Sequence, residues 1–282
     1  MKIKDAFWLL VSLVLALIPG CNQLFYNPTS LEYLTPKQLG FAYENVYFHS
    51  QDGTKLHGWF LPAQSGNAKG TIIHYHGNSE NLSHYFFHVF YFAQRSYNLF
   101  MFDYRGYGKS SGEATPQGVY EDAIAALNYV KNRPDVHPDK LIVFGQSLGG
   151  ALALRMMGEI KPEGIVAVVT EGAFYAYQQI AEEKMQEVWF TKLLKYPLSL
   201  LLFDDDYAPA PVIKNIAPVP LLIVHGTRDN VVPYHHGSQI FKAAQEPKQM
   251  WTIDNGKHVQ MLTKYRSIYR DRLIAFFDSH VD

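Results

Sequence analysis

The pentapeptide G-Q-S-L-G at residues 145–149 restricts the fold of this chain more than any other feature. A short apolar run, 141–144, precedes it, and a helical pattern over 148–157 follows it. A serine between two glycines at a strand-to-helix junction is typical of a sharp, strained turn, because glycines remove Cβ atoms that would collide with neighbouring elements. The oxygen of Ser147 is then expected to project above the sheet at the positive end of the helix. An unreactive glycine-rich turn is the alternative interpretation.

Strands and helices alternate along the rest of the chain from Phe41 onward. Strands are expected at 41–49, 55–61, 71–76, 97–104, 141–144, 164–170, 219–225 and 250–253, and helices at 81–95, 115–133, 148–157, 233–244 and 265–279. This alternation predicts an α/β fold, with a mostly parallel sheet and helices on both faces. The first two strands are expected to form an antiparallel hairpin. Residues 173–210 interrupt the alternation with two helical pieces, which predicts a helical lid insertion.

Composition excludes several classes of protein. Of the 282 residues, 48% are hydrophobic and 15% aromatic, which suits one large domain, expected at 41–282, and argues against a disordered chain. The 25 basic and 26 acidic side chains give a net charge of −1, and no Lys/Arg run offers a nucleic acid its phosphate contacts. A single cysteine excludes an intramolecular disulfide and a cysteine-based zinc or iron–sulfur site.

The amino terminus has the features of an export signal. Residues 6–18 are apolar and uncharged, follow Lys2 and Lys4, and are too short for a typical membrane span. The stretch ends at Gly20-Cys21 and resembles the bacterial lipobox, which predicts a signal peptide over 1–20, lipidation of Cys21 and a tether over 21–40. The resemblance implies an exported protein anchored to a membrane of the bacterial cell envelope. An uncleaved anchor with an incidental cysteine is the alternative.

A reactive serine needs a base, and the base needs an orienting carboxylate. Asp229 follows the expected strand 219–225, and His258 follows the strand 250–253. Because the carboxyl ends of parallel strands meet at one sheet edge, both side chains are expected near Ser147. Asp229 could instead cap a helix and His258 could be a solvated loop histidine. Glu171, after the strand 164–170, is the rival acid.

Acyl transfer also needs hydrogen-bond donors for the oxyanion that develops on the carbonyl oxygen. One expected donor is the backbone N–H of Leu148, directly after the serine. The second is the backbone N–H of Asn78, in the loop after the strand 71–76, where Gly77 allows a close approach of the backbone. A simple turn role for Asn78 is the alternative.

Five motifs occur in a fixed order along the chain: HGN at 76–78, DYRGYGKSSG at 103–112, GQSLGG at 145–150, HGTRD at 225–229 and GKH at 256–258. This set resembles the α/β-hydrolase superfamily, with its closest likeness to the BEM46-like and ABHD-type serine hydrolases, often labelled peptidase or esterase. The resemblance implies an α/β-hydrolase fold, Ser147 as nucleophile, Asp229 as acid and His258 as base. It also implies Asn78 and Leu148 at the oxyanion hole, but it carries no substrate.

Three other patterns are expected to be structural. Asp103 and Arg105 are expected to brace the loop beside the site rather than bind substrate. The aromatic run 85–92 is expected to be a helix packed on the sheet rather than a membrane-facing surface. The pairs His74/His76 and His235/His236 have no third ligand near them in sequence, so no metal site and no cofactor are expected.

Together these patterns predict a serine hydrolase that cleaves a carboxylic ester of a small acyl substrate through an acyl-enzyme on Ser147. Esters are favoured because their leaving groups need less activation than those of amides. The alternatives are a serine peptidase or amidase acting on short peptides, and a binding lipoprotein that keeps the fold without catalysis. The sequence leaves open the acyl length, the leaving group, the role of the lid, the oligomeric state and the choice between inner and outer membrane.

Overall fold

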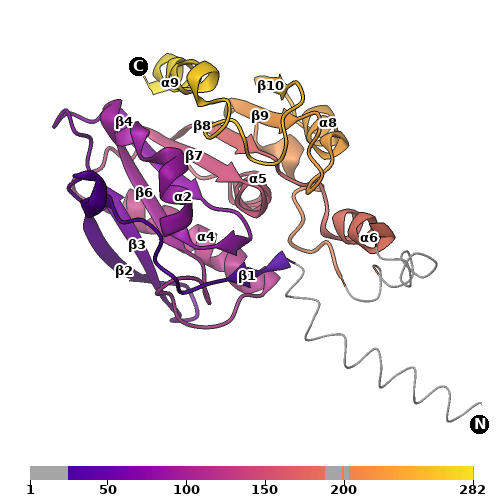
Figure 1. The fold of residues 1–282 in the computed structure, drawn as a ribbon, viewed down its shortest axis with the longest axis horizontal. Coiled ribbons are helices and arrows are strands. Elements are labelled where there is room, and N and C mark those ends of the chain that lie inside the picture. The colour runs from indigo at the N-terminus through magenta and orange to yellow at the C-terminus, as the bar shows by residue number, and fades with distance from the viewer. Residues whose placement is uncertain (1–24, 188–198, 200–202, 282) are drawn as a thin grey trace, which may run out of the picture.

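The centre of the protein is an eight-stranded sheet with the order β10-β9-β8-β7-β4-β6-β3-β2 (Figure 1). The computed structural model describes residues 25–187, 199 and 203–281. The strands are β2 (Glu44–His49), β3 (Lys55–Leu61), β4 (Gly70–Tyr75), β6 (Tyr97–Asp103), β7 (Leu141–Gln146), β8 (Ile165–Glu171), β9 (Leu221–Gly226) and β10 (Lys248–Ile253). Pairs from β10 to β6 are parallel, and β3 is antiparallel to both β2 and β6. The predicted mostly parallel sheet and its antiparallel hairpin are confirmed.

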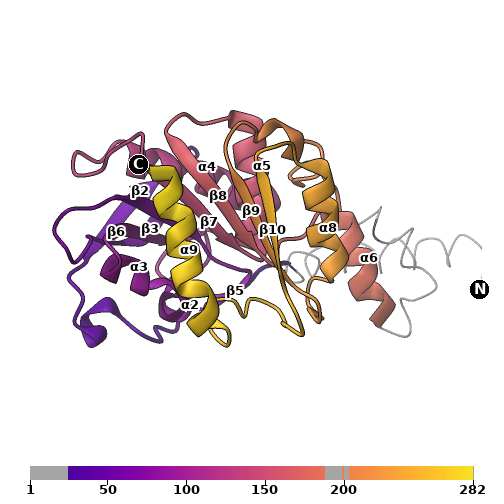
Figure 2. The same cartoon turned by 90° about the horizontal axis from the view of Figure 1, so that it is seen from above.

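Helices cover both faces of this sheet. One face carries α4 (Pro116–Lys131), α5 (Leu148–Ile160) and α8 (Tyr234–Ala243), and the other carries α2 (Leu82–Val89), α3 (Tyr91–Gln94) and α9 (Arg266–Val281). Figure 2 shows α9 in front of the strands, with α4 and α5 behind them. The strands β4, β6 and β7 are buried at every position, because helices cover them on both sides.

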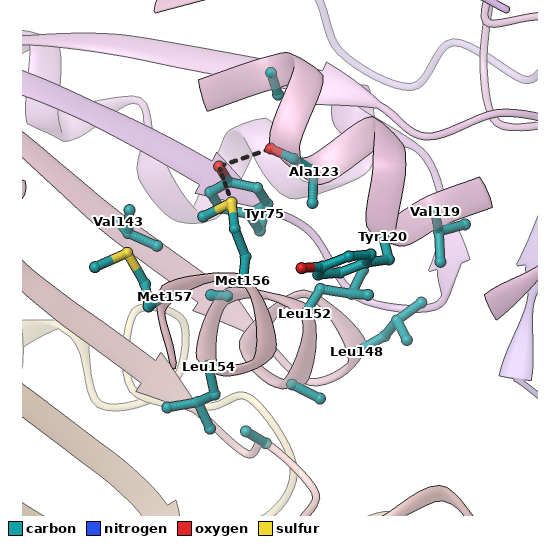
Figure 3. Packing of buried hydrophobic residues seen from close by; sticks show 14 of the residues in the cluster. Tyr75, Val119, Tyr120, Ala123, Val143, Leu148, Leu152, Leu154, Met156 and Met157 are labelled. Carbon is teal, nitrogen blue, oxygen red and sulfur yellow. Dashed lines mark hydrogen bonds between the residues drawn. The ribbon is translucent and has the colours of Figure 1, made fainter. Parts of the chain in front are cut away.

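The core beneath α5 joins three elements of the fold. Figure 3 shows Leu152 and Met156 of α5 packed towards Tyr75 of β4 and towards α4. The hydroxyl of Tyr75 donates to the carbonyl oxygen of Ala123 in α4 at 3.2 Å. This packing fixes the helix that begins directly after Ser147, and with it the position of the serine.

The predicted helix over 81–95 forms two helices, α2 and α3, which meet at Phe90. The backbone N–H of Phe90 still bonds the carbonyl of Phe86 at 3.0 Å, whereas Ala93 bonds Phe90 at 3.2 Å in a tighter turn. Within the aromatic run, most rings are buried against the sheet, although Phe87 is partly exposed. The expectation of a helix packed on the sheet therefore matches the structure.

The segment expected to be a tether is folded onto the domain from Phe25 onward. Phe25 and Tyr26 are buried, β1 (Asn27–Pro28) pairs in parallel with β5 (Ser79–Glu80), and a short 3-10 helix, η1, spans Pro36–Leu39. Burial of two aromatic rings and pairing of the backbone both favour this docked arrangement. The tether prediction is therefore wrong for the described part of 21–40.

Several expectations fall on residues outside the described part of the chain. These are the signal peptide over 1–20, the lipidation site Cys21 and the second helical piece of the lid, which falls mostly on 188–202. The first piece is α6 (Tyr177–Glu187). Among the described helices, none has both the length and the apolar character needed to cross a membrane.

Candidate active site

The turn between β7 and α5 holds Ser147 in a strained conformation. Its φ is +54° and its ψ is −118°, in a region that residues with side chains rarely adopt. A Cβ on Gly145 would overlap the carbonyl of Gly149, and a Cβ on Gly149 would overlap the carbonyl of Tyr75. The two glycines therefore permit the close approach that the sequence predicted, and the serine lies at the amino-terminal end of α5.

Ser147, His258 and Asp229 come together at the carboxyl ends of β7, β10 and β9. The Oγ of Ser147 lies 2.9 Å from Nε2 of His258, and Nδ1 of His258 lies 2.7 Å from Oδ2 of Asp229. A carboxylate can only accept, so Nδ1 carries the proton and Nε2 is free to accept from the serine. The geometry is that of a nucleophile, a base and an orienting acid.

The carboxyl of Asp229 is buried and held on both oxygens. Its Oδ1 accepts the backbone N–H groups of Val231 and Val232, each at 2.9 Å. Burial raises the pKa of Asp229, but the hydrogen bond from His258 and the backbone N–H of Val232 more than offset this, so the pKa lies below its ordinary value. Asp229 is therefore ionised beside His258 at neutral pH.

Glu171, the rival acid, lies at the end of β8 and serves different partners. Its carboxylate accepts the backbone N–H of Met261 at 2.6 Å and the side-chain amide of Gln146 at 2.8 Å. Burial raises the pKa of Glu171 above its ordinary value, although both hydrogen bonds oppose the shift. Within the described part of the chain, Glu171 makes no hydrogen bond to His258. It instead ties the loop that carries His258 to the strand of the serine.

The loop after β4 places Asn78 beside the serine. Asn78, Ser147 and Leu148 line one cavity, and a Cβ on Gly77 would lie 3.4 Å from the Cβ of Ser147. Among the residues that the structure describes, neither the backbone N–H of Asn78 nor that of Leu148 has an acceptor. Both N–H groups are thus available to an oxyanion.

Asp103 and Arg105 stabilise neighbouring loops through different partners. Oδ1 of Asp103 accepts the backbone N–H of Leu82 at 2.7 Å, at the start of α2. The Arg105 guanidinium lies 2.8 Å from the buried carboxylate of Asp122 and 2.8 Å from that of Asp52. Both side chains are therefore committed to the scaffold, in agreement with the structural role expected of them.

Two tyrosines of the same motif hold the loop after β4 from behind. The hydroxyl of Tyr107 donates to the carbonyl of Asn78 at 2.7 Å, and the hydroxyl of Tyr104 donates to the carbonyl of His76 at 3.2 Å. Asn78 also accepts the backbone N–H of Asn27 at 2.9 Å. These bonds hold the two peptide groups on either side of the one that would carry the oxyanion donor, a role that the sequence did not predict.

Replacing Tyr107 with phenylalanine is expected to lower kcat about fivefold with little change in KM, because a hydrogen bond contributes about 1 kcal/mol and this one acts through the oxyanion loop. Steady-state kinetics on a p-nitrophenyl ester would measure both constants. Tyr75→Phe is the matched control, since it removes another buried hydroxyl, one that bonds Ala123 away from the loop. An equal fall in kcat for both variants would contradict the positioning role of Tyr107.

The cavity at the serine is small and mostly apolar. It has a volume of about 100 Å³ and is lined by Phe25, Asn78, Ser147, Leu148, Phe174, Ile180, Lys184, Val231 and Val232. Three of these residues come from the predicted lid insertion. A larger open groove of about 840 Å³ lies between α4 and the edge strand β2 and contains none of the motif residues. The chemistry therefore belongs to the small cavity.

Two positions at the active site were not predicted from the sequence. Phe25, in the expected tether, forms part of its wall. Gly172 has a φ of +65°, and a Cβ there would lie 3.1 Å from the ring of His258. An aromatic pair inside a polar segment and a glycine directly after a strand were the available signals for these two positions.

One group of three side chains in the described ranges could in principle hold a metal: Glu183, His235 and His236. Glu183 accepts from Nε2 of His235 at 2.8 Å and from Nε2 of His236 at 3.1 Å. The backbone N–H of Tyr175 donates to Nδ1 of His236 at 3.1 Å, so Nε2 of that ring carries the proton. A protonated nitrogen does not bind a metal. The cluster instead fits a set of hydrogen bonds that joins Glu183 of α6 to the two histidines of α8. The other histidine pair is also engaged in hydrogen bonds: His74 bonds the side chain of Gln146, and His76 bonds the carbonyl of Gly77.

Several known proteins are similar to this chain in sequence. The model of the prolyl oligopeptidase family matches residues 83–282. The uncharacterized protein YfhR of Escherichia coli K12 is 38% identical over 237 residues, which cover 83% of this chain and 80% of YfhR. The α/β hydrolase domain-containing protein WAV2 of Arabidopsis thaliana is 30% identical over 96% of this chain and 92% of its own length. The protein bem46 of Schizosaccharomyces pombe is 28% identical over 71% of this chain and 64% of its own length.

A similar arrangement of strands and helices occurs in a solved structure. An esterase from Pyrococcus furiosus superposes with a TM-score of 0.75 over 92% of this chain and 99% of its own. The two sequences are 23% identical, so the likeness concerns the fold.

Proposed function

Because this chain belongs to the prolyl oligopeptidase family and has the α/β-hydrolase fold, we propose that it is a serine hydrolase that cleaves a carboxylic ester through an acyl-enzyme on Ser147. Membership of the family confirms the resemblance that the motifs predicted. The observation that carries the proposal is the chain of hydrogen bonds from Ser147 through His258 to Asp229, at 2.9 and 2.7 Å. The strained backbone of Ser147 supports the same role.

In the proposed mechanism, Nε2 of His258 takes the proton of Ser147 as its Oγ attacks the acyl carbonyl. The N–H groups of Leu148 and Asn78 bind the oxyanion, and Asp229 stabilises the imidazolium that forms. The C–O bond to the alcohol then breaks, and the alcohol leaves with the proton from His258. A water molecule, activated by the same histidine, releases the acid and restores the serine.

An ester is the favoured substrate for two reasons. Its leaving group needs less activation than that of an amide, and the cavity is mostly apolar and of a size that takes a short acyl group. A serine peptidase acting on short peptides is the second candidate, favoured by the description of the family whose model matches. A purely binding protein on this fold would have no need of the ordered triad.

Turnover of p-nitrophenyl butyrate and of the corresponding p-nitroanilide would separate ester from amide hydrolysis. With the detergent-solubilised full chain, we expect the ester to be hydrolysed more than about a hundredfold faster, a difference of about 2.7 kcal/mol in the barrier. Faster cleavage of peptide anilides than of the ester would replace the esterase proposal with the peptidase. Absence of turnover on both, by a folded protein, would favour the binding role.

We also propose that the protein is exported and anchored by a lipid on Cys21. The support is the apolar stretch 6–18 that precedes Gly20-Cys21. Two or three acyl chains on one cysteine would give stable attachment, because each buried CH₂ contributes about 0.8 kcal/mol. The membrane is thus the proposed partner of the amino terminus, beside an acyl substrate at Ser147.

A further inference from the structure

The beginning of the described chain forms part of the wall around the serine. Phe25 lines the same cavity as Ser147 and is 9% exposed. Its ring contacts those of Tyr177 at 5.0 Å and Phe203 at 5.3 Å between centroids, and both of these residues belong to the predicted lid insertion. Phe25, just before β1, and the lid helix α6 thus lie close together (Figure 1). The polypeptide therefore enters the domain beside the mouth of the active site.

Backbone hydrogen bonds fix this entry point. The N–H of Asn27 bonds the carbonyl of Asn78 at 2.9 Å, and the N–H of Thr29 bonds that of Glu80 at 3.3 Å. The carbonyl of Thr29 in turn accepts the N–H of Gly108 at 3.0 Å. The segment after Phe25 is thus held to the oxyanion loop, and its start cannot move away from the cavity without breaking these bonds.

Only a short stretch of chain separates Phe25 from the proposed membrane attachment. Cys21 is four residues earlier in the sequence, a distance of at most about 14 Å for extended chain. If the apolar stretch ending at Ile18 stayed in the membrane instead, seven residues would span at most about 25 Å. A domain of this size has a radius of gyration of about 18 Å, which corresponds to a diameter of roughly 45 Å for a compact sphere. Both links are shorter than this diameter, so Phe25 and the cavity beside it cannot lie on the side of the domain that faces away from the membrane.

We propose that the cavity at Ser147 faces the membrane to which the chain is attached, and that the substrate is an amphiphilic ester resident in that membrane. This inference rests on the proposed hydrolase activity and on membrane attachment of the amino terminus. The ester group and the first carbons of the acyl chain enter the cavity of about 100 Å³, and the remainder stays on the membrane side. Ser147 takes the acyl group, the alcohol leaves with the proton from His258, and water releases the acid.

The charge around the cavity indicates that the short link, rather than lipid charge, orients the domain. Three carboxylates, Asp204, Asp205 and Asp206, follow Phe203, and Asp205 accepts the backbone N–H of Gln178 at 3.0 Å, in the lid helix α6 that lines the cavity. Lys184 at the cavity donates to the carbonyl of Asn230 at 3.0 Å. Val231, which is 42% exposed, adds an apolar residue to the cavity lining. We therefore expect zwitterionic vesicles to support turnover as well as anionic ones do.

Lengthening the link is the sharpest test. A flexible Gly/Ser insertion of about 20 residues between Asn22 and Gln23 keeps the attachment but lets the domain rotate, with an r.m.s. reach of about 25 Å. The full chain would be reconstituted in phosphatidylcholine vesicles that contain 4-methylumbelliferyl oleate, with p-nitrophenyl butyrate as the dissolved substrate. We expect the insertion to slow hydrolysis of the embedded ester about fivefold and to leave the dissolved ester unaffected.

The matched control is the same insertion between Ser65 and Gly66, in the exposed turn between β3 and β4. It should leave both rates at the wild-type level, because exposed turns tolerate insertions. Intact-mass measurement of the vesicle-bound chain establishes the attachment, and a chain recovered free of the membrane, cleaved and without lipid, would overturn the inference. So would an unchanged rate on the embedded ester with the longer link. Absence of turnover on the dissolved ester would instead overturn the proposed function.

Discussion

Replacing Ser147 with alanine is expected to lower kcat for p-nitrophenyl ester hydrolysis by about four to six orders of magnitude. The side chain supplies the oxygen that attacks the carbonyl while Nε2 of His258 takes its proton, at an Oγ to Nε2 distance of 2.9 Å. The oxyanion donors on Asn78 and Leu148 remain in the variant, so a small residual rate above water is expected. Steady-state rates at saturating ester measure the effect.

Folding and background hydrolysis must be separated from loss of the nucleophile. Alanine at position 147 removes one oxygen and keeps the backbone, so the thermal unfolding midpoint should change by only a few degrees. Ser65→Ala is the matched control, because this serine lies in an exposed turn, where its hydroxyl donates to the carbonyl of Asn67. Retention of more than about a tenth of wild-type kcat by folded Ser147→Ala would rule out the acyl-enzyme mechanism.

Replacing Asp229 with asparagine is expected to lower kcat by about three to four orders of magnitude. Oδ1 of Asp229 accepts two backbone N–H groups, those of Val231 and Val232. An asparagine must keep its oxygen there, so its NH₂ group faces Nδ1 of His258. The histidine then carries its proton on Nε2 and can no longer accept that of Ser147. Measurement of kcat on the same ester tests this effect.

Glu171→Gln is the matched comparison for this variant. Both positions are buried carboxylates at the ends of adjacent strands, but Glu171 bonds Met261 and Gln146 rather than His258. We expect Glu171→Gln to lower the free energy of unfolding by about 1–3 kcal/mol and to reduce kcat by less than about tenfold. Denaturant unfolding and kcat together make the distinction. A larger kcat loss for Glu171→Gln than for Asp229→Asn would reverse the assignment of the acid.

The meeting of the three central residues could be predicted because each follows an apolar strand directly. Parallel strands end at one edge of a sheet, so Ser147, Asp229 and His258 are brought together by the order of elements alone. The glycines beside the serine predicted the sharp turn, and the glycine before Asn78 predicted the close approach of the loop after β4. Short motifs at strand ends therefore carried most of the information about the candidate site.

The contribution of the amino-terminal segment could not be predicted from pattern. Phe25 and Tyr26 belong to no periodic run, and β1 has only two residues. Its partner, β5, is about fifty positions further along the chain, so the pairing depends on tertiary contacts rather than local preference. The segment is rich in Asn, Pro, Thr and Ser, which is typical of a linker, so its composition predicted a tether.

Hydrogen bonds between side chains and loops that are far apart in the sequence could not be predicted either. Tyr107 bonds Asn78, and Glu171 bonds Met261, which is 90 positions away. Both polar side chains are buried, and a buried polar group needs a partner, but only the folded chain identifies it. The DYRGYG motif predicted a structural role beside the site, but only the structure identifies the loop after β4 as the segment that its tyrosines hold.

The most direct test of the central claim is the mass of the full chain after exposure to a fluorophosphonate probe, with proteolytic mapping of the modified peptide. An activated serine should gain one probe adduct, located on Ser147, while Ser147→Ala should gain none. Prior incubation with a p-nitrophenyl ester should slow the labelling by occupying the same oxygen. A folded wild-type chain that stays unlabelled, or an adduct on another residue that persists in Ser147→Ala, would contradict the assignment of Ser147 as the nucleophile.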